Sequence, residues 1–182
     1  MIRRPAPLLT APIRPLFGRV LLWLLLAVGF AACTETPLEP TLGSGDELSA
    51  IVDGQSVTFD FEASLSTYDA ANLNGDIVGA TSTIPIKSIR VSFRGVDLDN
   101  DTFPQTLTGA KASIVLVTTG DGGEDLEYRT PSDISQSNTT ITITATDGTI
   151  VDGTFSGTLV ESDDPTDLIS VTAGSFSARL ER

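Results

Sequence analysis

Apolar residues occupy every second position along much of this chain, and that period limits its possible folds more than any other feature. Residues 56–65 read SVTFDFEASL and residues 138–146 read NTTITITAT, and in both segments apolar and polar side chains alternate. A period of two is typical of a half-buried β-strand, whereas an amphipathic helix repeats every 3.6 residues. The residues that this alternation places on the core side are Val57, Phe59, Phe61, Ala63, Leu65, Ile141, Ile143 and Ala145.

Further strands and the turns between them follow from the same criterion. Strands are predicted over 48–52, 88–94, 149–160 and 167–180. Asp53-Gly54 and Asp147-Gly148 lie between strands, and Asp-Gly is a favoured hairpin turn. The alternation changes parity near Lys87 and near Ala173-Gly174. We expect a bulge or a bend at both places, because one extra residue moves the following side chains to the opposite face.

Residues 112–118 (ASIVLVT) differ from the other segments because they are apolar on both faces. Such a run indicates a central strand that is covered on both sides, or a strand in a barrel wall. After residue 46 we find no segment that combines helical periodicity, a capping box and adequate length. The sequence therefore predicts an all-β, antiparallel domain over residues 46–182, a sandwich or a barrel of about eight to ten strands.

Charge is distributed unevenly along the chain. The 182 residues include 11 Lys and Arg and 24 Asp and Glu, and the arginines up to Arg19 lie in a stretch without any acid. The remainder is strongly acidic, which excludes a nucleic-acid-binding protein, because such a protein needs a basic face against the phosphates. The acidity is consistent with adaptation to high salt or with metal binding.

Histidine is absent and cysteine occurs once, which restricts the available chemistry. A disulfide within the chain, a zinc site of the Cys/His type and catalysis by Ser-His-Asp or Cys-His groups are all excluded. A pair of carboxylates, as in glycoside hydrolysis, remains as an enzymatic alternative. We expect a protein that is not an enzyme, with a carboxylate-dependent hydrolase as an alternative.

The N-terminal segment has the three parts of an export signal. After the arginines, an apolar run extends over 20–30 (VLLWLLLAVGF), and Ala31, Ala32 and Cys33 follow. This ending resembles the lipobox of bacterial lipoproteins, with Phe30 where the family has leucine. The resemblance implies removal of a signal peptide over 1–32 and lipidation of Cys33, which would carry a diacylglycerol and acyl chains such as palmitate. A plain secretory signal and an uncleaved anchor are the alternatives.

The residues after the cysteine extend the resemblance. Residues 33–45 contain proline, threonine, glutamate and glycine with almost nothing to bury, which is typical of a flexible tether. Thr34 stands where an aspartate would retain a lipoprotein in the inner membrane, so the resemblance implies the outer membrane. An early Val-Asp-Gly turn, a late Thr-Asp-Gly turn and a closing pair, GTFS and GSFS, are also similar to a group of small, uncharacterised all-β envelope lipoproteins. That likeness implies a membrane contact through the lipid on Cys33 and implies no activity.

Asp97, Asp99 and Asp101 in GVDLDNDTF are the candidate metal ligands. A loop can aim alternate carboxylates at one hard cation, which makes Ca²⁺ or Mg²⁺ the metal to expect. Thr102 and Thr108 replace the glycine and the glutamate of an EF-hand loop. The alternative is a solvated turn of Asp and Gly, and it applies equally to the acidic loops GDGGED and ESDDPTD.

One short repeat occurs near the C-terminus. Residues 153–159 (GTFSGTL) and 174–180 (GSFSARL) share glycine, phenylalanine, serine and leucine in register. A duplicated ligand site would produce such a repeat, but these are the residues that a β core needs, and we favour the core interpretation.

The function expected from these features is that of a lipid-anchored, non-catalytic binding or structural module without a cofactor. A Ca²⁺-stabilised adhesion-type module is the first alternative. No tryptophan follows Cys33, and faces that bind sugars typically stack them on tryptophan or tyrosine, so carbohydrate recognition is not favoured. A barrel interior could instead hold a small apolar ligand.

Overall fold

The computed structural model describes residues 42–83, 85–119, 123–133 and 135–182. The predicted signal peptide, Cys33 and most of the predicted tether lie outside these ranges, as does Asp121. The described residues form an 11-stranded antiparallel sheet with two short 3₁₀ turns. The strands are β1 (Asp46–Val52), β2 (Gln55–Phe61), β3 (Thr67–Asp69), β4 (Asn74–Ala80), β5 (Lys87–Arg94), β6 (Gln105–Thr108), β7 (Ala112–Thr119), β8 (Asp125–Arg129), β9 (Thr140–Thr146), β10 (Ile150–Glu161) and β11 (Leu168–Arg179), and the turns are η1 (Ala63–Leu65) and η2 (Gly109–Lys111).

Eight of the strands close into a barrel in the order β1, β2, β4, β5, β7, β8, β10 and β11. The three others extend it: β3 pairs with β4, β9 pairs with the first half of β10, and β6 pairs with β9. This confirms the predicted all-β antiparallel class. Within the described ranges, no helix is long and apolar enough to cross a membrane.

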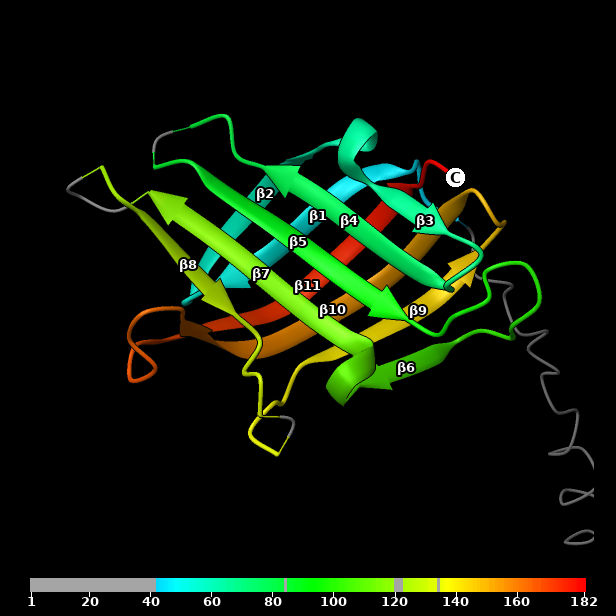
Figure 1. The fold of residues 1–182 in the computed structure, drawn as a ribbon. Helices are drawn as coiled ribbons and strands as arrows, with labels where there is room; N and C mark the ends of the chain where they lie inside the picture. The colour runs from blue at the N-terminus through cyan, green and yellow to red at the C-terminus, as the bar shows by residue number, and fades with distance from the viewer. Residues whose placement is uncertain (1–41, 84, 120–122, 134) are drawn as a thin grey trace, which may run out of the picture. The chain divides into compact units, whose positions relative to one another are not determined.

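The barrel consists of two layers that meet at two narrow junctions. β2 pairs with β4 through residues 60–61, and β8 pairs with β10 through residues 160–161. We call β3, β4, β5, β7 and β8 the front layer, and β2, β1, β11, β10, β9 and β6 the rear layer. In Figure 1 the front layer covers the rear layer, and the strands of the two layers run in different directions. The domain therefore combines the predicted sandwich and the predicted barrel.

Apolar side chains from both layers fill the space between them. The largest fully buried ones are Phe59, Phe93, Leu48, Ile77, Ile89, Ile114, Leu116, Ile141, Ile143, Leu159, Val52 and Val91. In β7 the inward residues are completely buried, while Val115 and Val117 lie half-buried on the outer face. This confirms the barrel-wall alternative for the segment that is apolar on both faces.

The predicted strand over 56–65 ends earlier than its alternation suggests. β2 ends at Phe61, and Ala63 and Leu65 lie exposed in η1, so their predicted burial was wrong. The reason is a turn that returns the chain to β3. Buried Ser66 donates its hydroxyl to the Glu62 carbonyl and accepts the Val78 N–H, which fixes this turn.

The alternation failed to predict β3, β4, β6 and β8. Three of these strands are short, with 3, 4 and 5 residues. The fourth, β4, has glycine at two of its inward positions, so its apolar period is interrupted. A methyl group on Gly75 would overlap the Phe93 ring, and one on Gly79 would lie 2.7 Å from Leu48. Side chains of neighbouring strands therefore fill the places that β4 leaves empty.

The predicted turns and one predicted bulge are present. Asp53 and Gly54 have φ of 48° and 77°, as a type I′ hairpin turn requires. Ala173 has φ of 47° at a register shift between β10 and β11, which confirms the parity change near Gly174. The parity change near Lys87 has a different origin, because β5 begins at that residue after a loop.

Candidate functional site

The repeat near the C-terminus builds the centre of the rear layer. β10 and β11 pair so that Gly153 lies opposite Phe176 and Phe155 lies opposite Gly174. A methyl group on Gly174 would lie 2.6 Å from the Phe155 ring, and one on Gly153 would overlap the Phe176 ring. The two rings stack with their centroids 6.3 Å apart. Each phenylalanine thus covers the glycine of the other repeat unit, which confirms the core interpretation.

This packing determines whether the barrel interior has room for a ligand. Aromatic and aliphatic side chains of both layers form one continuous buried cluster, which includes Tyr68, Phe93, Phe155 and Phe176. The three phenylalanine rings lie directly against glycine backbone at Gly75, Gly153 and Gly174. Space that a small apolar ligand would need is therefore occupied by side chains, and we look for binding surfaces on the outside of the barrel.

The three candidate metal ligands lie in one loop, and the carboxylate of each is already bonded to another group. The Asp97 carboxylate accepts the Asn100 side-chain amide and the backbone N–H groups of Asp99 and Asn100, which lowers its pKa. Asp99 forms a bidentate ion pair with Arg182, with N–O distances of 2.8 and 3.0 Å. Asp101 accepts the Asp97 N–H. Among the described residues, no group of three or more acidic or cysteine side chains is arranged to hold a metal ion.

The same loop closes one end of the barrel together with the C-terminus. Buried Tyr68 donates its hydroxyl to the Val96 carbonyl and accepts the Leu98 N–H. Arg182 lies over the Tyr68 ring at 5.4 Å from its centroid. Asp99 therefore has a structural partner, and its role here is to join the C-terminus to this loop.

A second acidic group lies where β8 meets β10. Tyr128 donates its hydroxyl to Asp167 at 2.8 Å, and this bond, together with burial, raises the pKa of Tyr128 to about 12. Buried Glu161 accepts the N–H groups of Asp163 and Asp164. Both carboxylates hold the loop between β10 and β11, and this arrangement does not suggest the carboxylate pair of a hydrolase.

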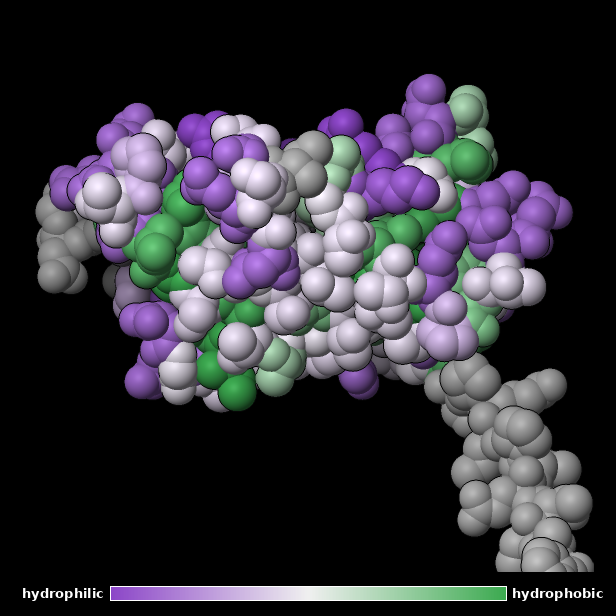
Figure 2. Space-filling model, turned by 90° about the horizontal axis from the view of Figure 1, so that it is seen from below, coloured by the Kyte–Doolittle hydropathy of each residue, from purple (hydrophilic) through white to green (hydrophobic). Residues whose placement is uncertain are grey.

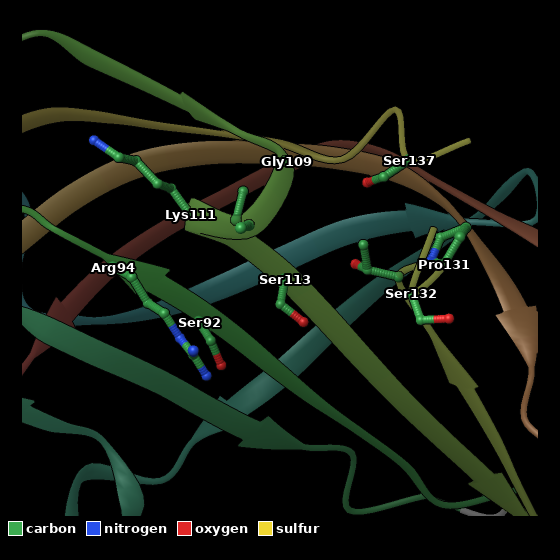
Figure 3. A pocket seen from close by; sticks show the side chains of 11 residues that line it. Ser92, Arg94, Gly109, Lys111, Ser113, Pro131, Ser132 and Ser137 are labelled. Atoms are coloured by element: carbon green, nitrogen blue, oxygen red, sulfur yellow. The ribbon is translucent and has the colours of Figure 1, made fainter. Parts of the chain in front are cut away.

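A groove of about 270 Å³ lies on the front layer, at the ends of β5 and β7. Figure 3 shows Ser92 and Arg94 on one side of it and Ser132 and Ser137 on the other, with Ser113 between them. The Lys111 side chain extends away from the serines. Arg94 and Lys111 take part in none of the salt bridges found among the described residues. The groove offers hydroxyls and one guanidinium, but only one cation faces it, which is weak recognition for an anion in so acidic a domain.

The rear layer carries a larger polar surface on its outer face. Hydroxyl residues on six neighbouring strands lie directly opposite one another in the pairing register. We call this set the hydroxyl row, and it consists of Thr106, Thr142, Thr154, Ser175, Ser49 and Thr58, on β6, β9, β10, β11, β1 and β2 in that order.

Hydrogen bonds join two pairs of neighbours in the row. The Oγ1 atoms of Thr106 and Thr142 are 3.1 Å apart, and so are the Oγ atoms of Ser49 and Ser175. Two hollows that share Ser175, one of about 460 Å³ and one of about 290 Å³, are lined by four members of the row, Thr58, Ser49, Ser175 and Thr154. Sequence alternation placed Thr58 on an outer face, but it did not predict β6, where Thr106 lies. The alignment of the row depends on the order of the strands, which alternation does not reveal.

No family model matches the chain, and searches of curated proteins and of solved structures find no match.

Proposed function

We propose that this chain is a lipid-anchored lipoprotein of the bacterial outer membrane, and that its β domain is a non-catalytic module that binds through its outer surface. The observation that carries the proposal is the filled barrel interior, since Phe155 and Phe176 occupy its centre against glycine backbone. A module that binds a partner on its outer face needs a stable scaffold and does not need an internal cavity. The carboxylates that could serve catalysis or metal binding instead hold loops, as Asp97 and Glu161 do.

The anchoring part of the proposal is supported by the small-small-Cys ending at Cys33 and by Thr34 after it. The way in which the folded domain begins is also compatible with a tether before it. Gly43 donates its N–H to Asp152, and Gly45 donates to Ser177, so the chain is held by β10 and β11 just before β1 begins. The acyl chains would supply the membrane affinity, at about 0.8 kcal/mol for each buried methylene.

Membrane fractionation of a Gram-negative host that produces the full chain tests this proposal. We expect the wild-type protein in the outer membrane and Cys33→Ser in the soluble fraction. Thr34→Asp is the matched variant, since it keeps the lipid and should move the protein to the inner membrane. Equal membrane binding of wild type and Cys33→Ser would support an uncleaved anchor, and a soluble wild type would support a plain secretory signal. Either result contradicts the proposal.

A further inference from the structure

We propose that the hydroxyl row is a docking surface for a neutral polysaccharide whose chain lies across the strands of the rear layer. This inference rests on the proposed function, because it names the partner class of the module's outer surface. Four members of the row are exposed, namely Thr106, Thr154, Ser175 and Thr58, and the other two are partly buried. The row therefore offers accessible donors and acceptors on both sides of its centre.

The spacing of the row is set by the sheet. Neighbouring strands lie about 4.8 Å apart, so six strands place hydroxyls at regular steps over roughly 24 Å. A hydroxyl can donate one hydrogen bond and accept two. Where neighbours bond to each other, as Ser49 and Ser175 do, each still has capacity for a ligand. A ligand that matches the row must itself present hydroxyls repeatedly along an extended chain.

A second row of hydroxyls widens this surface on three strands. Thr108 lies opposite Thr140, and Thr140 lies opposite Ser156, on β6, β9 and β10. Thr140 and Ser156 also line the smaller of the two hollows. On β6, β9 and β10 the surface therefore carries two parallel rows of hydroxyls. This width suits a polymer chain.

The side chains of the row are uncharged, and carboxylates lie beside them. Figure 2, which views the molecule from below, shows mostly pale side chains of intermediate hydropathy in its middle, with strongly hydrophilic ones gathered toward the two ends. Glu47 and Asp152 line the larger hollow beside the row. Exposed Glu47 can accept hydrogen bonds from sugar hydroxyls, and both carboxylates repel polyanions, so this surface favours a neutral polymer over an acidic one.

The row contains no aromatic residue, which determines how it would bind. Without stacking on a ring, every contact is a hydrogen bond that replaces one with water, so each sugar unit contributes little. Useful affinity then requires many contacts at once along one chain. We therefore expect binding to long or insoluble glycans and no measurable binding to their mono- or disaccharides.

Co-sedimentation of the full chain in detergent with cellulose, chitin or curdlan tests the proposal, with a polygalacturonate gel as the acidic polymer. We expect wild type to sediment with at least one of the neutral glycans and not with polygalacturonate. Sodium chloride should leave the bound fraction unchanged, because the contacts are not ionic. Glucose or cellobiose should fail to compete.

Thr154→Lys places a charge in the middle of the row and should lower binding about tenfold, since it interrupts the series of contacts. The matched control is Thr67→Lys, because Thr67 is also an exposed strand residue but lies on β3 in the front layer. Circular dichroism must show that both variants are folded. If Thr154→Lys does not fold, Thr154→Gln, which adds bulk without charge, is to replace it.

Three outcomes would overturn the proposal. One is no sedimentation with any of the three neutral glycans, and another is equal binding by wild type and the row variant. The third is retention of the protein by slowly grown ice without glycan binding, which would assign the row to ordered water. All are independent of anchoring, since a soluble protein can still bind glycan and an anchored one can fail to do so.

Discussion

Gly153 and Gly174 affect stability because a phenylalanine ring packs against each of them. In the antiparallel pair of β10 and β11, each glycine faces the phenylalanine of the other repeat unit. Absence of a side chain at these two positions lets the Phe155 and Phe176 rings approach the backbone closely. Glycine normally weakens a strand, and here that cost is offset by the apolar surface that the rings bury.

Gly174→Ala should therefore lower the free energy of unfolding by about 1–3 kcal/mol, because the added methyl group meets the Phe155 ring. Urea unfolding monitored by circular dichroism measures the change. Ser175→Ala is the control on the same strand, and we expect it to stay within about 0.5 kcal/mol of wild type. Equal stability of Gly174→Ala and wild type would show that the rings do not lie against this glycine.

Tyr128 makes stability depend on alkaline pH. Its hydrogen bond to Asp167 and its burial raise its pKa to about 12, from 10.0 in the unfolded chain. Below pH 10 the phenol is neutral in both states, so the full contribution to stability is present. Between pH 10 and 12 the unfolded chain releases the proton and the folded chain keeps it, so stability falls as pH rises.

We expect Tyr128→Phe to show a smaller loss of stability than wild type between pH 10 and 12. Absorbance of tyrosinate should show a tyrosine that titrates near pH 12 in the folded protein, and Asp167→Asn should lower that pKa. The account of this group fails if wild type and Tyr128→Phe lose stability in parallel over this range.

At the scale of elements, the loop over 97–101 is held by its own hydrogen bonds and by the C-terminus. Asp97 caps the turn through backbone N–H groups, Asp101 accepts the Asp97 N–H, and Asp99 pairs with Arg182. A cation that took all three carboxylates would have to break these bonds. Binding of a metal by this loop would therefore compete with these bonds.

Thermal unfolding with Ca²⁺, Mg²⁺ or sodium chloride at equal ionic strength tests this view of the loop. A ligand that binds only the folded state raises the midpoint, whereas screening of surface charge acts alike for all three salts. We expect equal midpoints. A rise that is specific to Ca²⁺ and that Asp101→Asn removes would restore the adhesion-type alternative.

Individual strands also show where the sequence pattern was sufficient to predict the structure and where it was not. Strands with a complete alternation, such as β9, were predicted with the correct buried face, because burial of one face imposes the period of two. β4 was not predicted, since Gly75 and Gly79 leave its inward face without side chains. The hydroxyl row was not predicted either, because alignment across six strands depends on strand order and register.

At the scale of the whole domain, the inner faces of the two layers provide stability, and their outer faces are available for contact with partners. The inward faces form one buried cluster, and the outward faces carry the polar surfaces. Among the described residues, closure of the sheet pairs most strands on both sides, and the strands at its two ends, β3 and β6, are short. Short end strands limit unwanted pairing with other chains. Under the anchoring proposed above, such a domain would present one outer face at the membrane surface.

The mass of the mature protein extracted from membranes of a producing cell tests the central claim most directly. The account predicts a chain that begins at Cys33 and carries a thioether-linked diacylglycerol and a further acyl chain. Tandem mass spectrometry of the N-terminal peptide should place the added mass on Cys33. An N-terminus elsewhere, or a Cys33 without lipid, would contradict the proposal that this domain is an anchored lipoprotein.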